Sequence, residues 1–201
     1  MPNQQNGFLL INKPAGITSH DVIARLRKIT GIQKIGHAGT LDPFANGLLV
    51  VAVGREATTK IAQFVKLDKQ YDAELQLGAS SNTFDLTGII TERLPHKTPT
   101  FEEVENVLKS LLGQQKQIPP MFSAKKIKGQ KLYELARKGI EIERKPVEIT
   151  LHSLKILDYA FPKLTITTHV SSGTYIRALA HDIGKQLQTD AYLTALTRTA
   201  I

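Results

Sequence analysis

A glycine-rich stretch at residues 36–47, with the sequence GHAGTLDPFANG, places one histidine and one aspartate where they could do chemistry. Its three glycines and one proline predict an irregular loop. The apolar run over residues 48–54 predicts a buried strand closed by a glycine. His37 and Asp42 would then lie on a loop against a rigid strand, as catalytic groups commonly do. The loop alone favours a simpler interpretation, a turn in which Asp42 bonds to its own backbone ahead of Pro43.

A second stretch concentrates positive charge. The chain of 201 residues has a formal net charge of +8, and residues 118–139 hold six of its cations against one acid, Glu134. These cations are Lys125, Lys126, Lys128, Lys131, Arg137 and Lys138. A solvated surface loop is a common reason for such a run. The concentration of charge, interleaved with Met121, Phe122 and Tyr133, favours an electrostatic arm that binds nucleic-acid phosphates.

The composition limits the other classes of function. Hydrophobic residues make up 41% of the chain, which is enough for a packed core. The chain has no cysteine, which excludes disulfides and thiolate metal sites. No apolar run approaches the ~20 residues of a membrane span, and the amino end lacks a signal-peptide core, so we expect a cytoplasmic protein that uses no membrane. His181 and Asp182 are adjacent, but no second histidine cluster completes a ligand set, so no metal site is expected.

Helices and strands follow one another irregularly along the chain. Periodicity and capping residues predict helices over residues 19–30, 56–66, 101–112, 131–138 and 175–187. Thr18 or Ser19 is expected to cap the first of these helices, and Thr100 and Glu103 are expected to form a capping box at the start of the third. Strands are predicted over residues 7–12, 71–77, 147–154 and 163–170. Because strands and helices do not alternate, we expect an α+β fold around a mainly antiparallel or mixed sheet, in one domain.

Arg177 has an unusual predicted position. It falls in the first turn of the last helix, for which Thr174 is the expected cap. The helix dipole disfavours a cation there, so the placement indicates a partner carboxylate.

Several motifs together resemble those of the tRNA pseudouridine-55 synthases, the TruB family, in the same order along the chain. Residues 36–47 resemble the active-site motif of that family, residues 68–71 its tyrosine motif and residues 172–177 its arginine motif. The further matching stretches are residues 7–14, 83–88, 118–133 and 193–198. The resemblance implies a pseudouridine-synthase fold over residues 1–201, with helices flanking the sheet. Residues 118–139 would form a basic insertion that grips tRNA.

The resemblance also implies a reaction, the isomerisation of a uridine in the T loop of tRNA to pseudouridine. Such a reaction has no redox step and no net hydrolysis, so it requires neither a cofactor nor a metal. By motif position Asp42 is the catalytic carboxylate. Asp42 could attack the base ring, attack the sugar carbon or take a sugar proton, and the sequence leaves these three acts open.

Roles follow by resemblance for the residues around this carboxylate. Arg177 is expected to pair with it and keep it ionised. Because the target base must leave its stack, Tyr71 and Tyr175 are expected to line the pocket, and Tyr71 could also relay the final proton. Leu196 would supply an apolar wall. His37 would fill the space that the base vacates or contact the loop RNA. The protein is expected to be a monomer, and its expected partner is the T stem-loop of tRNA.

Two alternatives remain open. A non-catalytic RNA-binding or RNA-chaperone module could share the fold and the charge, although a pure binder has no need of Asp42. A pseudouridine synthase that acts on ribosomal RNA through guide complexes is the other alternative, and the short length argues against it.

Lys13, beside Pro14, is a further candidate for shaping the Asp42 loop. Members of the family continue into a small carboxy-terminal RNA-binding domain, so we expect this sequence to be the catalytic domain.

Overall fold

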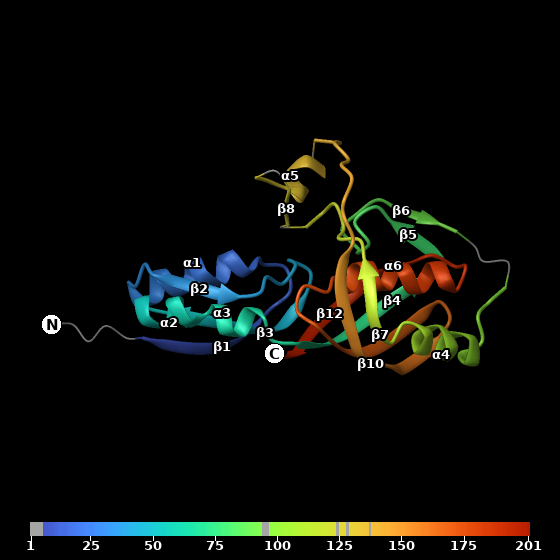
Figure 1. Cartoon of the computed structure of the whole chain (residues 1–201), viewed down its shortest axis with the longest axis horizontal. Helices are drawn as coiled ribbons and strands as arrows, with labels where there is room; N and C mark the ends of the chain where they lie inside the picture. The colour runs from blue at the N-terminus through green and yellow to red at the C-terminus, as the bar shows by residue number, and fades with distance from the viewer. Residues whose placement is uncertain (1–5, 94–96, 124, 128, 137) are drawn as a thin grey trace. The chain divides into compact units, whose positions relative to one another are not determined.

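The computed structural model describes residues 6–93, 97–123, 125–127, 129–136 and 138–201, apart from the side chains of Lys126 and Lys131 (Figure 1). The chain forms two compact units. The first comprises the residues up to Asp72 together with Ala195–Ile201, and the second comprises Ala73–Thr194. No helix in these described ranges is long and apolar enough to cross a membrane.

The first unit is built on strand β3, which pairs with three other strands. The strands of this unit are β1 (Gly7–Lys13), β2 (Ile35–Ala38), β3 (Asn46–Val53) and the end of β12 (Ala191–Ala200). Strands β1 and β2 run antiparallel to β3. Strand β12 runs parallel to β3, with Arg198 opposite Gly47. These neighbours bury β3 from Leu49 onward, which explains its continuous apolar sequence.

Three helices belong to the same unit, α1 (Ser19–Thr30), α2 (Arg55–Lys60) and α3 (Ala62–Val65). Thr18 caps α1 in a capping box that Asp21 completes, so of the two caps expected the structure selects Thr18. The prediction of one helix over residues 56–66 is wrong, because the chain breaks between α2 and α3. The hydroxyls of Thr58 and Thr59 donate to carbonyls of the preceding turn, and such bonds bend helices.

The second unit contains β10, the longest strand described. The strand order is β12-β4-β11-β10-β7, and β10 runs antiparallel to both neighbours. These strands, other than β12, are β4 (Lys69–Leu77), whose first residues lie in the first unit, β7 (Gly113–Gln117), β10 (Val147–Ala160) and β11 (Lys163–Val170). The shorter strands are β5 (Ala79–Ser81), β6 (Ile90–Glu92), β8 (Lys126–Ile127) and β9 (Gln130–Lys131).

The helices of the second unit are α4 (Phe101–Ser110), α5 (Leu132–Ala136) and α6 (Ile176–Gln186). The predicted capping box of α4, formed by Thr100 and Glu103, is confirmed. The predicted cap of α6 is wrong, because the cap position is Tyr175 and has no side-chain bond. Thr174 instead donates its hydroxyl to the Ser171 carbonyl at 2.9 Å. Parallel and antiparallel pairs in one sheet, with flanking helices, confirm the α+β class.

The stretch at residues 36–47 is only partly irregular, which corrects the expectation of a loop throughout. Its first residues belong to β2, with His37 opposite Val51, and its last two open β3. Pairing with β3 gives these backbone groups partners, and that gain outweighs the local preference of glycine. The irregular part, which carries Asp42, is therefore residues 39–45.

We expect Gly47→Ala to destabilise the first unit strongly. Gly47 has a φ of 102°, and a Cβ placed there would lie 2.3 Å from the Arg198 carbonyl oxygen. The free energy of unfolding should fall by at least about 2 kcal/mol, measured by urea denaturation. Gly36→Ala is the matched control, since its nearest neighbour would be 3.7 Å from the new Cβ. Equal losses in the two variants would contradict this account.

Candidate active site

The residues on either side of Asp42 are fixed by hydrogen bonds within the first unit. Before it, the Leu41 backbone N–H donates to the Ser19 hydroxyl at 2.9 Å, and that hydroxyl lies 3.2 Å from the Leu41 carbonyl. After it, the Pro43 carbonyl accepts from the Gly16 N–H at 2.8 Å and from Lys13 Nζ at 3.4 Å. The half-buried carboxylate is thus carried by a backbone that is held on both sides.

The structure confirms the prediction that Lys13 shapes this loop. Its side chain is fully buried, and Nζ also donates to the carbonyls of Pro14 at 2.9 Å and Ile17 at 2.7 Å. Burial lowers the pKa of Lys13, and the negative charge of Asp42 opposes that shift. Because Asp42 acts on the pKa of Lys13, the ammonium lies near the carboxylate. Its positive charge in turn favours the ionised form of Asp42.

Arg198 and Lys69 are two further buried cations of the same unit, with exposed fractions of 1% and 5%. Arg198 donates to the carbonyls of Leu48 at 2.7 Å and Gly39 at 3.1 Å. Lys69 Nζ donates to carbonyls at the end of α3, of which Leu67 is the nearest at 2.6 Å. Burial lowers the pKa of Lys69, and the charge of Arg198 lowers it further. The unit therefore keeps several positive charges beside one carboxylate-bearing loop.

Tyr71 lies on β4 at the edge of this group and is 9% exposed. Burial raises the pKa of its phenol, the positive charge of Arg198 opposes the rise, and the negative charge of Asp42 adds to it. The phenol is therefore protonated at neutral pH. The predicted pocket residues Tyr71 and Asp42 lie in the same unit and act on each other electrostatically.

His37 lies on β2 and is half-buried. Burial lowers its pKa, and the neighbouring charges of His20 and Arg198 lower it further. His37 is consequently neutral at neutral pH. Its expected contact with RNA would therefore be a hydrogen bond or stacking contact rather than an ion pair.

Arg177 has the carboxylate partner that its helix position indicates, and within the second unit that partner is Asp85. Arg177 Nη1 lies 3.4 Å from Asp85 Oδ2, and both side chains are 5% exposed. The guanidinium also donates to the carbonyls of Thr83 at 3.1 Å and Phe122 at 2.8 Å. The predicted pairing of Arg177 with Asp42 joins residues of different units and stays a prediction.

The other predicted pocket residues are placed on rigid elements. Tyr175 begins α6, and its backbone exchanges two hydrogen bonds with the Gln117 side chain, at 2.8 Å and 3.1 Å. Leu196 is 7% exposed on β12, two residues before Arg198. The roles of Tyr175 and Leu196 in binding a base stay predictions.

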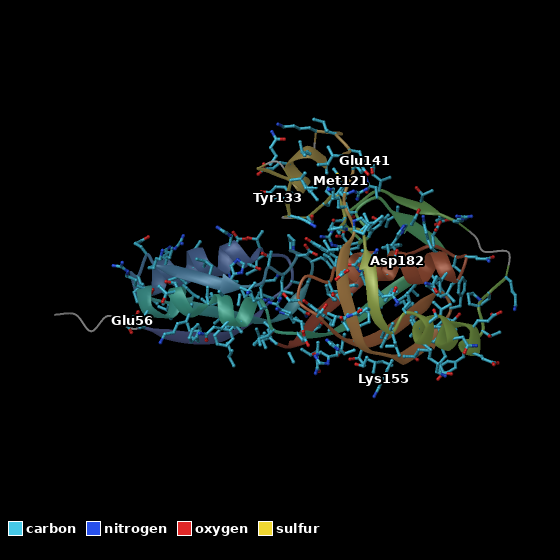
Figure 2. The ribbon with its side chains drawn as sticks, viewed as in Figure 1. Glu56, Met121, Tyr133, Glu141, Lys155 and Asp182 are labelled. Carbon is cyan, nitrogen blue, oxygen red and sulfur yellow. The ribbon has the colours of Figure 1, made fainter. Side chains whose placement is uncertain are left out.

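The basic insertion is described only in part. Lys128 and Arg137 lie outside the described residues, and Lys126 and Lys131 are placed by backbone alone, in β8 and β9. Lys125 is half-buried and Lys138 is exposed. Met121 and Tyr133 lie on this insertion, near α5 (Figure 2).

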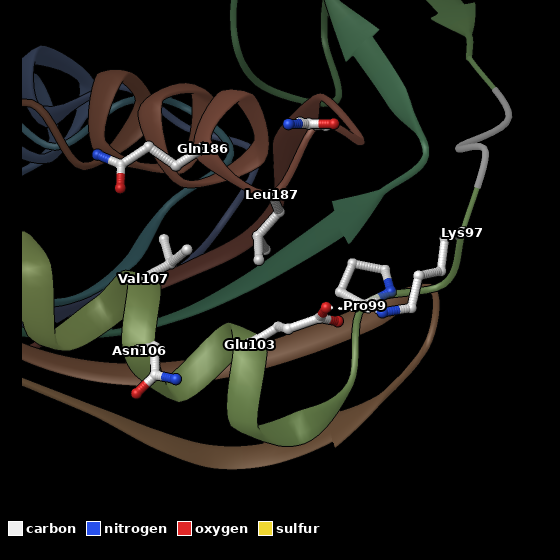
Figure 3. A pocket seen from close by; sticks show the side chains of 8 residues that line it. Lys97, Pro99, Glu103, Asn106, Val107, Gln186 and Leu187 are labelled. Atoms are coloured by element: carbon white, nitrogen blue, oxygen red, sulfur yellow. Dashed lines mark hydrogen bonds and ion pairs between the residues drawn. The ribbon is translucent and has the colours of Figure 1, made fainter.

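A cavity of about 370 Å³ lies elsewhere in the second unit, between α4 and the end of α6 (Figure 3). Its charged groups already pair with each other, since Lys97 Nζ lies 2.8 Å from Glu103 Oε1 and Glu103 also caps α4. Within the ranges that the structure describes, no three histidine or acidic side chains are grouped to hold a metal ion. The Asp42 loop is the stronger candidate for chemistry.

Comparison with known proteins agrees with the motifs. The model of the TruB family pseudouridylate synthase, N-terminal domain, matches residues 27–176, which include Asp42 and Tyr71. The chain belongs to the TruB family. It is 47% identical to tRNA pseudouridine synthase B of Protochlamydia amoebophila (strain UWE25) over 198 residues, which cover 98% of this chain and 75% of that protein. Its identity to the enzyme of that name from Chlamydia abortus (strain DSM 27085 / S26/3) is 46%, covering 96% of this chain and 82% of that protein.

Solved structures show the same family fold. The chain matches a protein of the "Crystal Structure of a Cbf5-Nop10-Gar1 Complex" with a TM-score of 0.74 and 28% identity, over 98% of this chain and 48% of that one. It matches a protein in the "Structure of H/ACA RNP bound to a substrate RNA containing 2'-deoxyuridine" with a TM-score of 0.69 and 26% identity. That match covers 96% of this chain and 46% of the other. The chain thus spans about half the length of these solved proteins.

The sequence did not reveal the roles of Ser19 and Arg198, which hold the Asp42 loop, or of Asp85, which pairs with Arg177. By pattern, Ser19 is a possible helix cap, Arg198 the last residue of a matching stretch and Asp85 a turn residue. The motif at residues 83–88 could have drawn attention to Asp85, because a buried arginine needs an acid.

We expect Asp85→Asn to damage the second unit and the reaction together. The substitution leaves the buried Arg177 charge without its carboxylate, which should cost about 3–5 kcal/mol of unfolding free energy. The rate of isomerisation in a single turnover should also fall, because Arg177 loses the group that orients it. Asp158→Asn, at an exposed acid on β10, is the control. A stable Asp85→Asn variant with a normal rate would show that the pair is dispensable.

The lowered pKa of His37 predicts a specific dependence of stability on pH. As pH falls, the unfolded chain binds a proton at the usual pKa of 6.5, before the folded protein does. The contribution of neutral His37 is therefore complete above that value and is lost progressively below it. His37→Gln should flatten the decrease in unfolding free energy between about pH 7 and pH 5, measured by urea denaturation. Identical slopes in wild type and variant would contradict the assignment.

Proposed function

We propose that this chain isomerises a uridine in the T loop of tRNA to pseudouridine, with Asp42 as the essential carboxylate. Membership of a pseudouridylate synthase family and 47% identity to a tRNA pseudouridine synthase B support the reaction and the substrate class. The observation that carries the role of Asp42 is the loop itself. A turn that merely reverses the chain needs neither fixation on both sides nor buried cations around it.

The chemistry requires little from outside the protein. The bond between N1 of the uracil and C1′ of the ribose breaks, the base turns, and a bond forms between C5 and C1′. The product has the same atoms as the substrate, so no redox partner or second substrate is consumed. All three acts that the sequence leaves open for Asp42 need its ionised form, which the neighbouring cations favour.

Tyr71 is suited to a different task. Because burial raises the pKa of its phenol, Tyr71 enters the reaction protonated. It therefore acts first as a hydrogen-bond donor or a stacking surface, and any proton relay through it must begin with donation. The base has to be flipped out of its stack before either residue reaches it. His37, Tyr175 and Leu196 would then contact the flipped base or the RNA that it leaves.

The basic insertion would hold the T stem-loop by its phosphates. We propose that the enzyme works in the cytoplasm as a monomer on this substrate. A guide-dependent reaction on another RNA is the alternative, suggested by the solved ribonucleoprotein with a bound substrate RNA. The higher identity to tRNA enzymes, 47% against 26%, favours tRNA.

The proposed function is tested by mapping pseudouridine on a T-loop transcript. Wild-type protein should convert the target uridine, and Asp42→Asn should give no detectable product, because the amide is not a nucleophile or a base. Glu56→Gln, at an exposed acid of the same unit, should retain the activity. Absence of product with wild type would reject the function, and full activity of Asp42→Asn would reject the role of Asp42.

The role of the basic insertion is tested by removing two of its described cations. Lys125→Gln with Lys138→Gln should weaken tRNA binding and reduce the slope of log affinity against log salt by about 2. The single-turnover rate at saturating tRNA should not change. Lys155→Gln with Lys163→Gln removes two exposed cations from β10 and β11 and is the control (Figure 2). A slower chemical step with normal affinity would contradict the phosphate-binding role.

A further inference from the structure

Arg198 is a buried side chain of the first unit to which the mechanism above gives no step. It is 1% exposed, and its Nε and Nη2 donate to the carbonyls of Leu48 and Gly39 at 2.7 Å and 3.1 Å. These two carbonyls lie on opposite sides of Asp42 in the chain. One guanidinium therefore ties both ends of the loop to β12.

Gly47 makes room for this arginine, because a Cβ there would collide with the Arg198 backbone. A Cβ on Gly39 would be in ordinary contact with Arg198 Nη1, at 3.4 Å. Both glycines have positive φ, 82° and 102°, which disfavours other residues there. Arg198 therefore lies against both glycines, although it is far away in the sequence.

The third nitrogen of the guanidinium is unusual. Arg198 Nη1 is buried and meets no hydrogen-bond acceptor in the described structure. Buried donors are nearly always paired in native proteins, so Nη1 needs an acceptor nearby. The phenol of Tyr71 is within reach of the guanidinium, because the charge of Arg198 and a side-chain hydrogen bond with it both oppose the rise that burial causes in the pKa of Tyr71.

We propose that Arg198 is a positioning residue for the isomerisation: it clamps the Asp42 loop at both ends, and its guanidinium orients the Tyr71 hydroxyl by a hydrogen bond to the phenol oxygen. A phenol oxygen that accepts from Nη1 directs its own proton away from the guanidinium, toward the substrate. Arg198 thereby sets the geometry of a carboxylate and of a proton donor without touching the base. This proposal rests on the proposed function.

Arg198→Met and Arg198→Lys test the clamp, because both keep an unbranched, flexible side chain. Methionine removes both hydrogen bonds and the charge, whereas lysine keeps the charge but does not reproduce the fork. The matched control is Arg27→Met. Arg27 also donates through Nε and Nη2 to two carbonyls, of Gln33 and Ile35, in the same unit.

At saturating tRNA, Arg198→Met should lower the single-turnover rate by about 10- to 100-fold, because a small misplacement of reacting groups has effects of that size. The affinity for tRNA should change by less than about threefold, since the lost contacts do not involve RNA. Arg198→Lys should fall between wild type and Arg198→Met. Arg27→Met should keep its rate within about twofold of wild type.

Two measurements do not depend on activity. Hydrogen exchange of the amides over residues 39–48 should accelerate in Arg198→Met and not in Arg27→Met. In protein labelled with 3-fluorotyrosine, the ¹⁹F resonance of Tyr71 should shift in Arg198→Met, while that of Tyr159 in the other unit should not.

The outcomes separate this proposal from the proposed function. A wild type that makes no pseudouridine rejects the function, whereas the exchange and ¹⁹F measurements still judge the clamp. A normal rate in Arg198→Met, an equal loss in Arg27→Met, or a loss confined to tRNA affinity would overturn the positioning role. Unchanged exchange or an unmoved Tyr71 resonance would overturn its structural basis.

Discussion

The site depends on buried cations whose hydrogen bonds are made to backbone carbonyls. For Lys13 and Lys69, every hydrogen bond described goes to a carbonyl oxygen, and Arg198 donates to two carbonyl oxygens. Carbonyls satisfy the donors, which makes burial tolerable, but they do not cancel the charge. The first unit therefore retains a positive potential around the loop. Asp42 is the acid on that loop, so the same bonds that order the backbone also favour its carboxylate.

The sheet makes this arrangement possible. Strand β12 pairs with β3 in parallel at Gly47. This pairing brings Arg198, which is distant in the sequence, against the start of β3. Parallel contact of this kind requires a long connection, here the entire second unit. The positive φ of Gly47 and the absence of its Cβ let the two backbones approach. The loop geometry thus depends on a contact between distant parts of the sequence.

This dependence explains what the sequence could and could not predict. Local signals sufficed for α1, whose cap is one of two candidates, for the capping box of α4, and for the α+β class. They failed at β2, where pairing with β3 decides the structure, and at the break between α2 and α3. Asp42 was found through a motif, but Arg198 and Ser19 act on its loop only through tertiary contacts. No periodicity or composition reveals such partners before the chain is folded.

The two buried arginines have different electrostatic surroundings, and this constrains their roles. Arg177 has a carboxylate, Asp85, beside it in addition to two carbonyls, so much of its charge is already balanced. The described hydrogen bonds of Arg198 go to two carbonyls and to the Tyr71 hydroxyl, which are all uncharged. The charge of Arg198 is therefore not balanced by these partners. Within the first unit, Lys13 is the cation on which Asp42 acts electrostatically, so its ammonium also favours the ionised carboxylate.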